Sequence, residues 1–169
     1  MRTGAAGVLV GFGGGAAHTT RRTLGIHAPM ATALSDVAAA RRDYLDESGG
    51  RYVHVIADGG VGTSGDIVKA VACGADAVML GAALARATEA PGRGFHWGPE
   101  AHHSQLPRGE RVEVGTVASL EEILNGPGRG ADGTTNIVGA LKRAMATTGY
   151  TDVKDFQKVE VLVAPGRAY

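Results

Sequence analysis

The sequence predicts an α/β protein with a parallel sheet, and two observations support this prediction. Short apolar runs occupy residues 5–11, 52–57 and 75–81, and their weak alternation is typical of strands buried on both faces of a parallel sheet. Segments with helical spacing, 32–48 and 63–74, separate these runs. Strand, loop and helix therefore repeat in the order of a βαβ architecture.

The first predicted helix is residues 32–48, TALSDVAAARRDYLDES. Leu34, Val37, Ala38 and Arg41 recur at helical spacing, which indicates one face packed against the protein. The charged residues of this helix are expected to form a solvated face: Arg41, Arg42, Asp43, Asp46 and Glu47.

The second predicted helix, residues 63–74, carries signals at both ends. Ser64 is a candidate N-cap and Asp66 lies in the first turn, where a carboxylate complements the helix dipole. Gly74 is a typical residue for ending a helix.

The periodic pattern stops after Gly81. Residues 86–116, called the excursion below, are rich in Pro, Gly and His and predict either a long ordered excursion or a mobile flap. Three parallel strands are too few to close a barrel, and two crossover connections are too few to cover both faces of a parallel sheet. The chain is therefore expected to be part of something larger.

The C-terminal helices are predicted within residues 119–158. Ser119 and Glu122 have the spacing of a capping box, and Gly126 provides a stop. In residues 134–150, apolar positions fall on one helical face, and a shorter helix begins near residue 151 or 152. The members of that face are Ile137, Leu141, Ala144 and Met145.

Composition and charge restrict the function classes. Seventeen basic residues balance seventeen acidic ones, so no global basic field would gather nucleic acid or anionic lipid. No apolar run reaches the roughly 20 residues of a membrane-spanning helix. The single Cys73 excludes an internal disulfide framework, and its place in a helix predicts a buried packing residue. The start of the chain is a poor signal peptide, so a cytoplasmic location is expected.

The stretch GFGGGAAH, residues 11–18, follows the first predicted strand. A dinucleotide fingerprint is disfavoured because no acidic residue about 20 positions on ends a second strand. A loop whose backbone groups line an anion or ion site is the favoured interpretation, and a plain flexible turn is the alternative. His18 ends this loop as a candidate reactive side chain.

Asp58, Gly59 and Gly60 follow the second predicted strand, and Gly81 follows the third. A carboxylate at a strand end can accept hydrogen bonds from sugar hydroxyls, and glycines let a phosphate approach backbone N–H groups. Alternatively, Asp58 merely caps a loop. Two consecutive strands that end in glycine and lead into helices match the phosphate-site arrangement after the last two strands of (β/α)₈ barrels.

Four stretches together resemble the C-terminal half of the IMP dehydrogenase/GMP reductase family, and most closely its actinobacterial IMP dehydrogenase-related branch. They are GFGGGAAHTTR, GRYVHVIADGGVGTSGDIVKAVACGADAVMLG, ATEAPG and DGTTNIVGALKRAMATTGY. The resemblance implies that residues 1–169 are a partial catalytic domain. This domain would comprise about strands 6–8 of a (β/α)₈ barrel with their helices, incomplete as a closed barrel because the first five β/α units are absent.

The resemblance also implies roles for individual residues. Asp58, Gly59, Gly60, Gly81 and Ala82 match nucleotide-binding positions, with Asp58 on the ribose and the glycine backbones on the phosphate. Gly13, Gly15 and His18 match a loop whose carbonyls hold a monovalent cation such as K⁺. Thr20 matches a threonine that organises the reacting water or leaving ammonia. Residues 96–114 match the mobile flap.

Family members carry a nucleophilic cysteine at position 18, and here the residue is His18. Ala16 and Ala82 stand where serine hydroxyls assist phosphate binding, and each missing hydroxyl removes about 0.5–1.5 kcal/mol of hydrogen bonding. A metal site formed by His96, Glu100, His102 and His103 is disfavoured because the spacing fits no strong ligand template.

Three functions follow as hypotheses. The chain could retain a purine nucleoside monophosphate half-site while the family reaction, NAD- or NADP-dependent oxidation of IMP or reduction of GMP, is weak or absent. It could be a working oxidoreductase in which His18 acts as a base and another chain supplies the missing half-barrel. It could instead be a non-catalytic regulatory or interaction module that pairs with a full-length relative. An exposed barrel edge predicts association in each case. The resemblance implies a homo-oligomer of the tetramer type.

Overall fold

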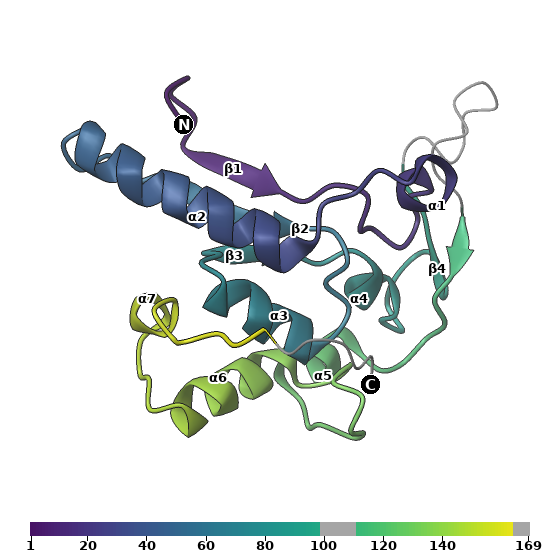
Figure 1. Cartoon of the computed structure of the whole chain (residues 1–169). Coiled ribbons are helices and arrows are strands. Elements are labelled where there is room, and N and C mark those ends of the chain that lie inside the picture. The colour runs from purple at the N-terminus through teal and green to yellow at the C-terminus, as the bar shows by residue number, and fades with distance from the viewer. Residues whose placement is uncertain (99–110, 164–169) are drawn as a thin grey trace.

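The computed structural model describes residues 1–98 and 111–163, and its three longest strands are separated along the chain by helices (Figure 1). In order the elements are β1 Gly7–Val10, α1 Thr20–Leu24, α2 Met30–Glu47, β2 His54–Asp58, α3 Ser64–Ala72, β3 Ala77–Met79, α4 Ala82–Ala85, β4 Phe95–His96, β5 Val112–Glu113, α5 Leu120–Asn125, α6 Ile137–Thr147 and α7 Val153–Phe156.

The three predicted strands form one parallel sheet in the order β1-β2-β3. Val8 pairs with Val55 across β1 and β2, and Ala57 pairs with Val78 across β2 and β3. The predicted α/β class and the parallel pairing are confirmed. Because all three strands run the same way, their carboxyl ends meet at one edge of the sheet.

One face of the sheet is buried and the other is open, so the prediction of strands buried on both faces is wrong for this chain. Val10, Val55 and Ala57 pack with Leu34 of α2 and Ala70 of α3. On the opposite face, Leu9 is 59% and Met79 47% exposed. The reason is that α2 and α3 cover a single face, and no described element packs on the other.

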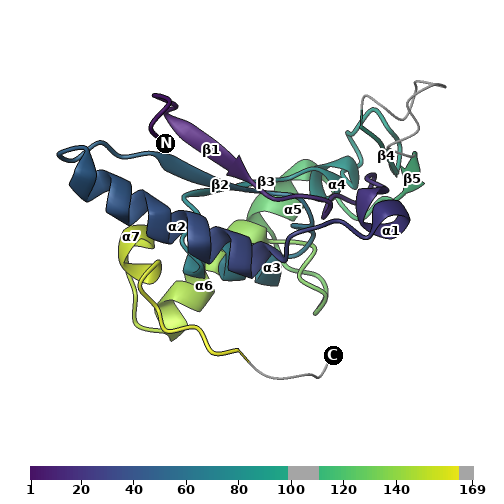
Figure 2. The same ribbon diagram turned by 45° about the horizontal axis from the view of Figure 1, so that its top comes forward.

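A second core lies between α3 and the C-terminal helices (Figure 2). Ile67 of α3 packs in it with Ile123, Ile137 and Met145, and Phe156 of α7 closes one side. The Phe156 ring meets Tyr150 edge-on with centroids 5.7 Å apart. The amphipathic face predicted for residues 134–150 is therefore the face of α6 that packs on α3.

The N-terminal cap of α5 is the one that the sequence predicts, whereas the N-terminal cap of α3 is a different residue. Ser119 and Glu122 form the predicted capping box at the start of α5. At α3, however, the N-cap is Thr63 and not Ser64, because Thr63 has the extended backbone of a cap and its side chain accepts the Asp66 N–H, while the Ser64 N–H donates to the Gly133 carbonyl at 2.8 Å. Thr63 and Asp66 form the capping box there.

The charge pattern predicted that Arg41 belongs to the solvated face of α2, and this prediction is wrong. Arg41 Nη1 donates to Asp76 Oδ2 at 2.7 Å, and both side chains are 7% exposed. Arg42 and Asp43 on the same helix are exposed, as expected. Helical spacing already placed Arg41 beside Leu34 and Ala38, and the buried carboxylate of Asp76 is the partner that allows a cation there.

The described ends of the excursion are ordered. Ala87 bridges to Ala118 at its base, and the Val114 N–H donates to the Gly94 carbonyl at 2.8 Å. Between these contacts β4 and β5 pair antiparallel. Residues 99–110, which include much of the predicted flap, lie outside the described residues. In the part of the chain that is described, no helix is long and apolar enough to cross a membrane.

Candidate functional site

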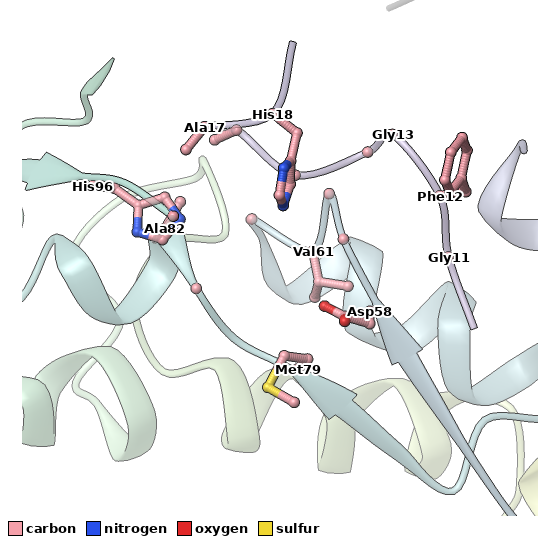
Figure 3. A pocket seen from close by; sticks show the side chains of 18 of the residues that line it. Gly11, Phe12, Gly13, Ala17, His18, Asp58, Val61, Met79, Ala82 and His96 are labelled. Atoms are coloured by element: carbon pink, nitrogen blue, oxygen red, sulfur yellow. The ribbon is translucent and has the colours of Figure 1, made fainter. Parts of the chain in front are cut away.

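A cavity of about 580 Å³, called the pocket below, lies at the carboxyl ends of β1, β2 and β3 (Figure 3). It brings together every site residue predicted from the sequence, although these come from three separate segments. They are Gly13, Gly15, His18, Thr20, Asp58, Gly59, Gly60, Gly81 and Ala82. Their roles in binding and chemistry stay predictions.

The first glycine loop, residues 11–15, packs directly on the second, residues 59–60. A Cβ at Gly11 would lie 1.7 Å from the Asp58 carbonyl oxygen, and the backbone there has a φ of 149°. A Cβ at Gly14 would lie 3.3 Å from the Gly59 carbonyl. Only glycine lets two loop backbones approach this closely, so the glycines shape the floor of the pocket.

His18 ends the first glycine loop in a tight turn. Its N–H donates to the Gly15 carbonyl at 3.1 Å, and a Cβ at Gly15 would lie 2.6 Å from His18 Cδ2. The imidazole therefore rests on Gly15 and extends towards the interior of the pocket (Figure 3). Thr20, the first residue of α1, lines the same side.

Asp58 is the last residue of β2, and its side chain belongs to the open face of the sheet. It pairs in register with Met79, which also lines the pocket. The two glycines after it have φ values of 106° and 76°, so the chain turns sharply away and leaves the half-buried Asp58 carboxylate at the cavity floor. This position suits a hydrogen-bond acceptor for ligand hydroxyl groups.

The loop between Asp58 and α3 is held by Asp66. The Asp66 carboxylate accepts the Gly62 N–H at 3.2 Å, the Thr63 N–H at 3.1 Å and the Thr63 hydroxyl at 2.9 Å. Burial works to raise the pKa of Asp66, but hydrogen bonds from Thr63 and Gly62 outweigh it and hold the pKa below its usual value. Asp66 therefore acts as an ionised anchor that orders the second loop.

The wall opposite Asp58 consists of Gly81, Ala82 and His96. A Cβ at Gly81 would lie 3.3 Å from both Cε1 and Nε2 of His96, so the imidazole edge abuts the Gly81 backbone. Figure 3 shows His96 beside Ala82, away from Asp58. Among the described lining residues, the side chains that can carry a charge are Asp58, His18 and His96.

Metal and thiol chemistry find little support in the described residues. No group of three or more His, Cys, Asp or Glu side chains there could hold a metal ion. Glu100, His102 and His103 of the disfavoured metal site lie outside the described residues. Cys73 is buried under the sheet, as predicted, and does not line the pocket.

Sequence reasoning missed three contributors to the pocket region. Met79 lines the floor and Trp97 lies beside His96, while Arg111 crosses over the rings of Phe95 and Trp97 at 5.0 and 4.7 Å. The alternation of Phe95, His96 and Trp97 was the available signal, since it is the pattern of a short strand. The glycine-rich surroundings concealed it.

The fold and the pocket define an α/β protein with a cavity at the carboxyl ends of parallel strands, lined by glycine loops and a strand-terminal carboxylate. The family model described as the IMP dehydrogenase / GMP reductase domain matches residues 1–110. The chain belongs to this family.

Individual relatives agree with this assignment. An uncharacterized oxidoreductase of Mycobacterium leprae is 56% identical over 167 residues, which are 97% of this chain and 44% of that protein. The inosine-5'-monophosphate dehydrogenase of Aquifex aeolicus is 34% identical over 174 residues, covering 94% of this chain and 34% of that enzyme. The crystal structure of an IMP dehydrogenase/GMP reductase-like protein from Corynebacterium glutamicum superposes with a TM-score of 0.89 at 57% identity. The superposition includes 97% of this chain and 43% of that protein. The chain therefore spans less than half the length of these relatives.

Proposed function

We propose that the pocket binds a purine nucleoside monophosphate, with the ribose at Asp58 and the phosphate at the glycine backbones of Gly60 and Gly81. The observation behind this proposal is that one cavity unites a strand-terminal carboxylate with two glycine loops whose backbones touch. Its volume of about 580 Å³ is within the range of small-molecule sites. The relatives named as inosine-5'-monophosphate dehydrogenases indicate the class of nucleotide.

The proposed reaction class is that of the family, an oxidoreduction of IMP or GMP, and we propose that it is weak or absent in this chain alone. The family nucleophile would be a thiolate at position 18, where this chain has an imidazole. An imidazole adduct would be a charged and labile species. Cys73 cannot substitute because it lies in the core beneath the sheet.

Nicotinamide dinucleotide, NAD or NADP, is the cofactor that the family implies, and the described residues do not by themselves form a site that fits it. The first glycine loop leads into α1, a helix of five residues with no acidic group in its first turn. A dinucleotide fingerprint instead opens a long helix and uses an acidic residue on the ribose. The cofactor would need surface contributed by another chain or segment.

A monovalent cation such as K⁺ is proposed for the carbonyls of Gly13, Gly15 and His18. The Gly15 carbonyl already accepts the His18 N–H, so one of its lone pairs is engaged in closing the turn. Cation binding would rely on the second lone pair of this carbonyl and on the other two residues.

Isothermal titration calorimetry with IMP and GMP tests the half-site. The Asp58→Asn variant should weaken nucleotide binding about 10-fold or more, because it removes charge-assisted hydrogen bonds to ribose hydroxyls. Asp36→Asn, at an exposed position of α2, is the matched control and should bind as the wild type does. Nucleotide binding that is absent, or unchanged in Asp58→Asn, contradicts the proposal.

Nicotinamide absorbance at 340 nm tests the reaction class. The wild type should show little turnover of IMP with NAD or of GMP with NADPH, and His18→Cys tests whether a thiol restores it. Robust turnover by the wild type would favour the hypothesis in which His18 acts as a base.

The second candidate function is an interaction module, which the open sheet face favours. Leu9 and Met79 are exposed on that face, and the outer edge of β1 has no strand partner among the described residues. Exposed apolar faces and unpaired strand edges promote association. We therefore propose a homo-oligomer or a complex with a full-length relative in the cytoplasm, testable by analytical ultracentrifugation with and without that relative.

A further inference from the structure

The short strand β4 presents its side chains in two directions. Arg111 lies over the rings of both Phe95 and Trp97, so these two rings share one side of the strand. Side chains alternate along an extended segment, which directs the intervening His96 to the other side. The His96 ring meets Gly81 in the pocket, and Trp97, which follows the strand, lines the cavity as well.

The Gly81 wall of the pocket otherwise offers few polar side chains. Gly81 and Ala82 present backbone and a methyl group, and Ala16 and Ala17 of the first loop add two more methyl groups. His18, the other imidazole, rests on Gly15. His96 is therefore the side chain at the Gly81 wall, among the described residues, that can donate a hydrogen bond and carry a positive charge.

We propose that His96 is the side chain that recognises the phosphate group of the bound nucleotide. This inference rests on the proposed function and adds a specificity-determining residue to it. A ring nitrogen of His96 donates to a phosphate oxygen, which either protonation state of imidazole allows. Asp58 on the opposite side accepts from the ribose, so a cation-capable group and an anion lie at opposite ends of the pocket. This arrangement sets the direction in which a nucleoside monophosphate enters.

The contacts around β4 explain how His96 keeps its place. The Arg111 guanidinium spans the two aromatic rings at 5.0 and 4.7 Å, and a Cβ at Gly92 would lie 3.2 Å from Trp97 Cζ3. The Val114 N–H to Gly94 carbonyl hydrogen bond fixes the base of the strand pair. These contacts hold β4, and with it His96, in position.

The test compares IMP with inosine, which lacks the phosphate, by calorimetry on the intact chain. The wild type should bind IMP more tightly than inosine. In His96→Ala, affinity for IMP should fall about 10-fold while affinity for inosine stays within about two-fold, because a charge-assisted hydrogen bond to phosphate is lost. His96→Gln, which keeps a neutral donor, should recover part of the loss.

A second variant changes Gly81, the other partner of the same contact. Gly81→Ala adds a methyl group 3.3 Å from the His96 ring, at a backbone φ of −102° that tolerates a side chain. It should displace the imidazole and lower the IMP-to-inosine affinity ratio in the same direction. Arg42→Ala, which removes an exposed charge on α2, is the control and should leave both affinities unchanged.

The outcomes separate this proposal from the one on which it rests. A wild type that binds IMP no more tightly than inosine overturns both the phosphate site and the role of His96. A wild type that prefers IMP, with the same preference in His96→Ala, overturns only the role of His96. Equal losses for IMP and inosine also overturn it, since they indicate a structural effect. If His96→Ala does not fold by circular dichroism, His96→Gln takes its place, and an IMP-to-inosine affinity ratio equal to that of the wild type overturns the role of His96.

Discussion

The Arg41 guanidinium donates to the Asp76 carboxylate at 2.7 Å, across 35 residues of sequence and with both side chains 7% exposed. The same carboxylate accepts the Tyr52 hydroxyl at 2.7 Å and the Val55 N–H at 2.8 Å, and Lys154 of α7 also donates to it. Asp76 therefore joins α2, β2 and α7 at the end of the sheet away from the pocket.

Replacing Asp76 by Asn should strongly destabilise the fold. The Arg41 charge would remain buried without a full counter-charge, and breaking a buried pair in this way costs about 3–5 kcal/mol. Urea unfolding followed by circular dichroism measures this loss. The control is Arg2→Ala, which removes an ion pair with Glu47 in which the Arg2 side chain is 79% exposed. That change should cost far less, because water and salt screen an exposed pair, and equal losses in the two variants would contradict the prediction.

The stability of the protein should fall in acid through Asp76. Burial works to raise the pKa of Asp76, but hydrogen bonds from Lys154, Tyr52 and the Val55 N–H outweigh it and hold the pKa well below its usual range. A lowered folded-state pKa gives stability that is present above the unfolded value of about 3.9 and is lost as the pH falls through the folded value. The difference in unfolding free energy between wild type and Asp76→Asn should therefore shrink below about pH 4. A constant difference down to about pH 2 would exclude this role for the carboxylate.

Thr63→Ala should destabilise α3 more than Ser64→Ala does. Thr63 Oγ1 accepts the Asp66 N–H at 3.3 Å and donates to the Asp66 carboxylate at 2.9 Å. Loss of an N-cap side chain costs about 1 kcal/mol, whereas Ser64 contributes its backbone N–H to Gly133, which alanine retains. Thermal unfolding of the two variants measures the difference. The reverse order would show that Ser64 is the cap.

Gly11→Ala should disrupt the pocket as well as the fold. Its Cβ would overlap the Asp58 carbonyl oxygen at 1.7 Å, and β1 would have to move away from β2. Overpacking of this kind costs about 1–3 kcal/mol or more, and displacement of Asp58 should weaken IMP binding in calorimetry.

The matched control for this change is Gly65→Ala in α3, where a Cβ would meet only Thr63 Oγ1 at 3.8 Å. It should be neutral or stabilising by about 0.5–1 kcal/mol, because alanine favours a helix over glycine. A Gly11→Ala variant as stable as Gly65→Ala would contradict the close approach of the two strands.

The sequence by itself determined the features that depend on neighbours a few residues apart. The βαβ order follows from apolar runs and helical spacing, and the Ser119–Glu122 capping box joins residues three apart. The gathering of Asp58, Gly81 and His18 at one pocket was also within reach, because the carboxyl ends of parallel strands share one edge of the sheet. Each of these follows from local patterns and from the direction of the strands.

Tertiary structure alone decided the features that depend on distant contacts. A charge pattern cannot show that Arg41 meets Asp76, and two adjacent cap-forming residues cannot show that Thr63 forms the cap while the Ser64 N–H donates to Gly133. The open face of the sheet depends on which elements pack against it, and the approach of His96 to Gly81 depends on the pairing of β4 with β5. In each case the free energy that selects the arrangement comes from groups far apart in the chain, so no short stretch of sequence contains it.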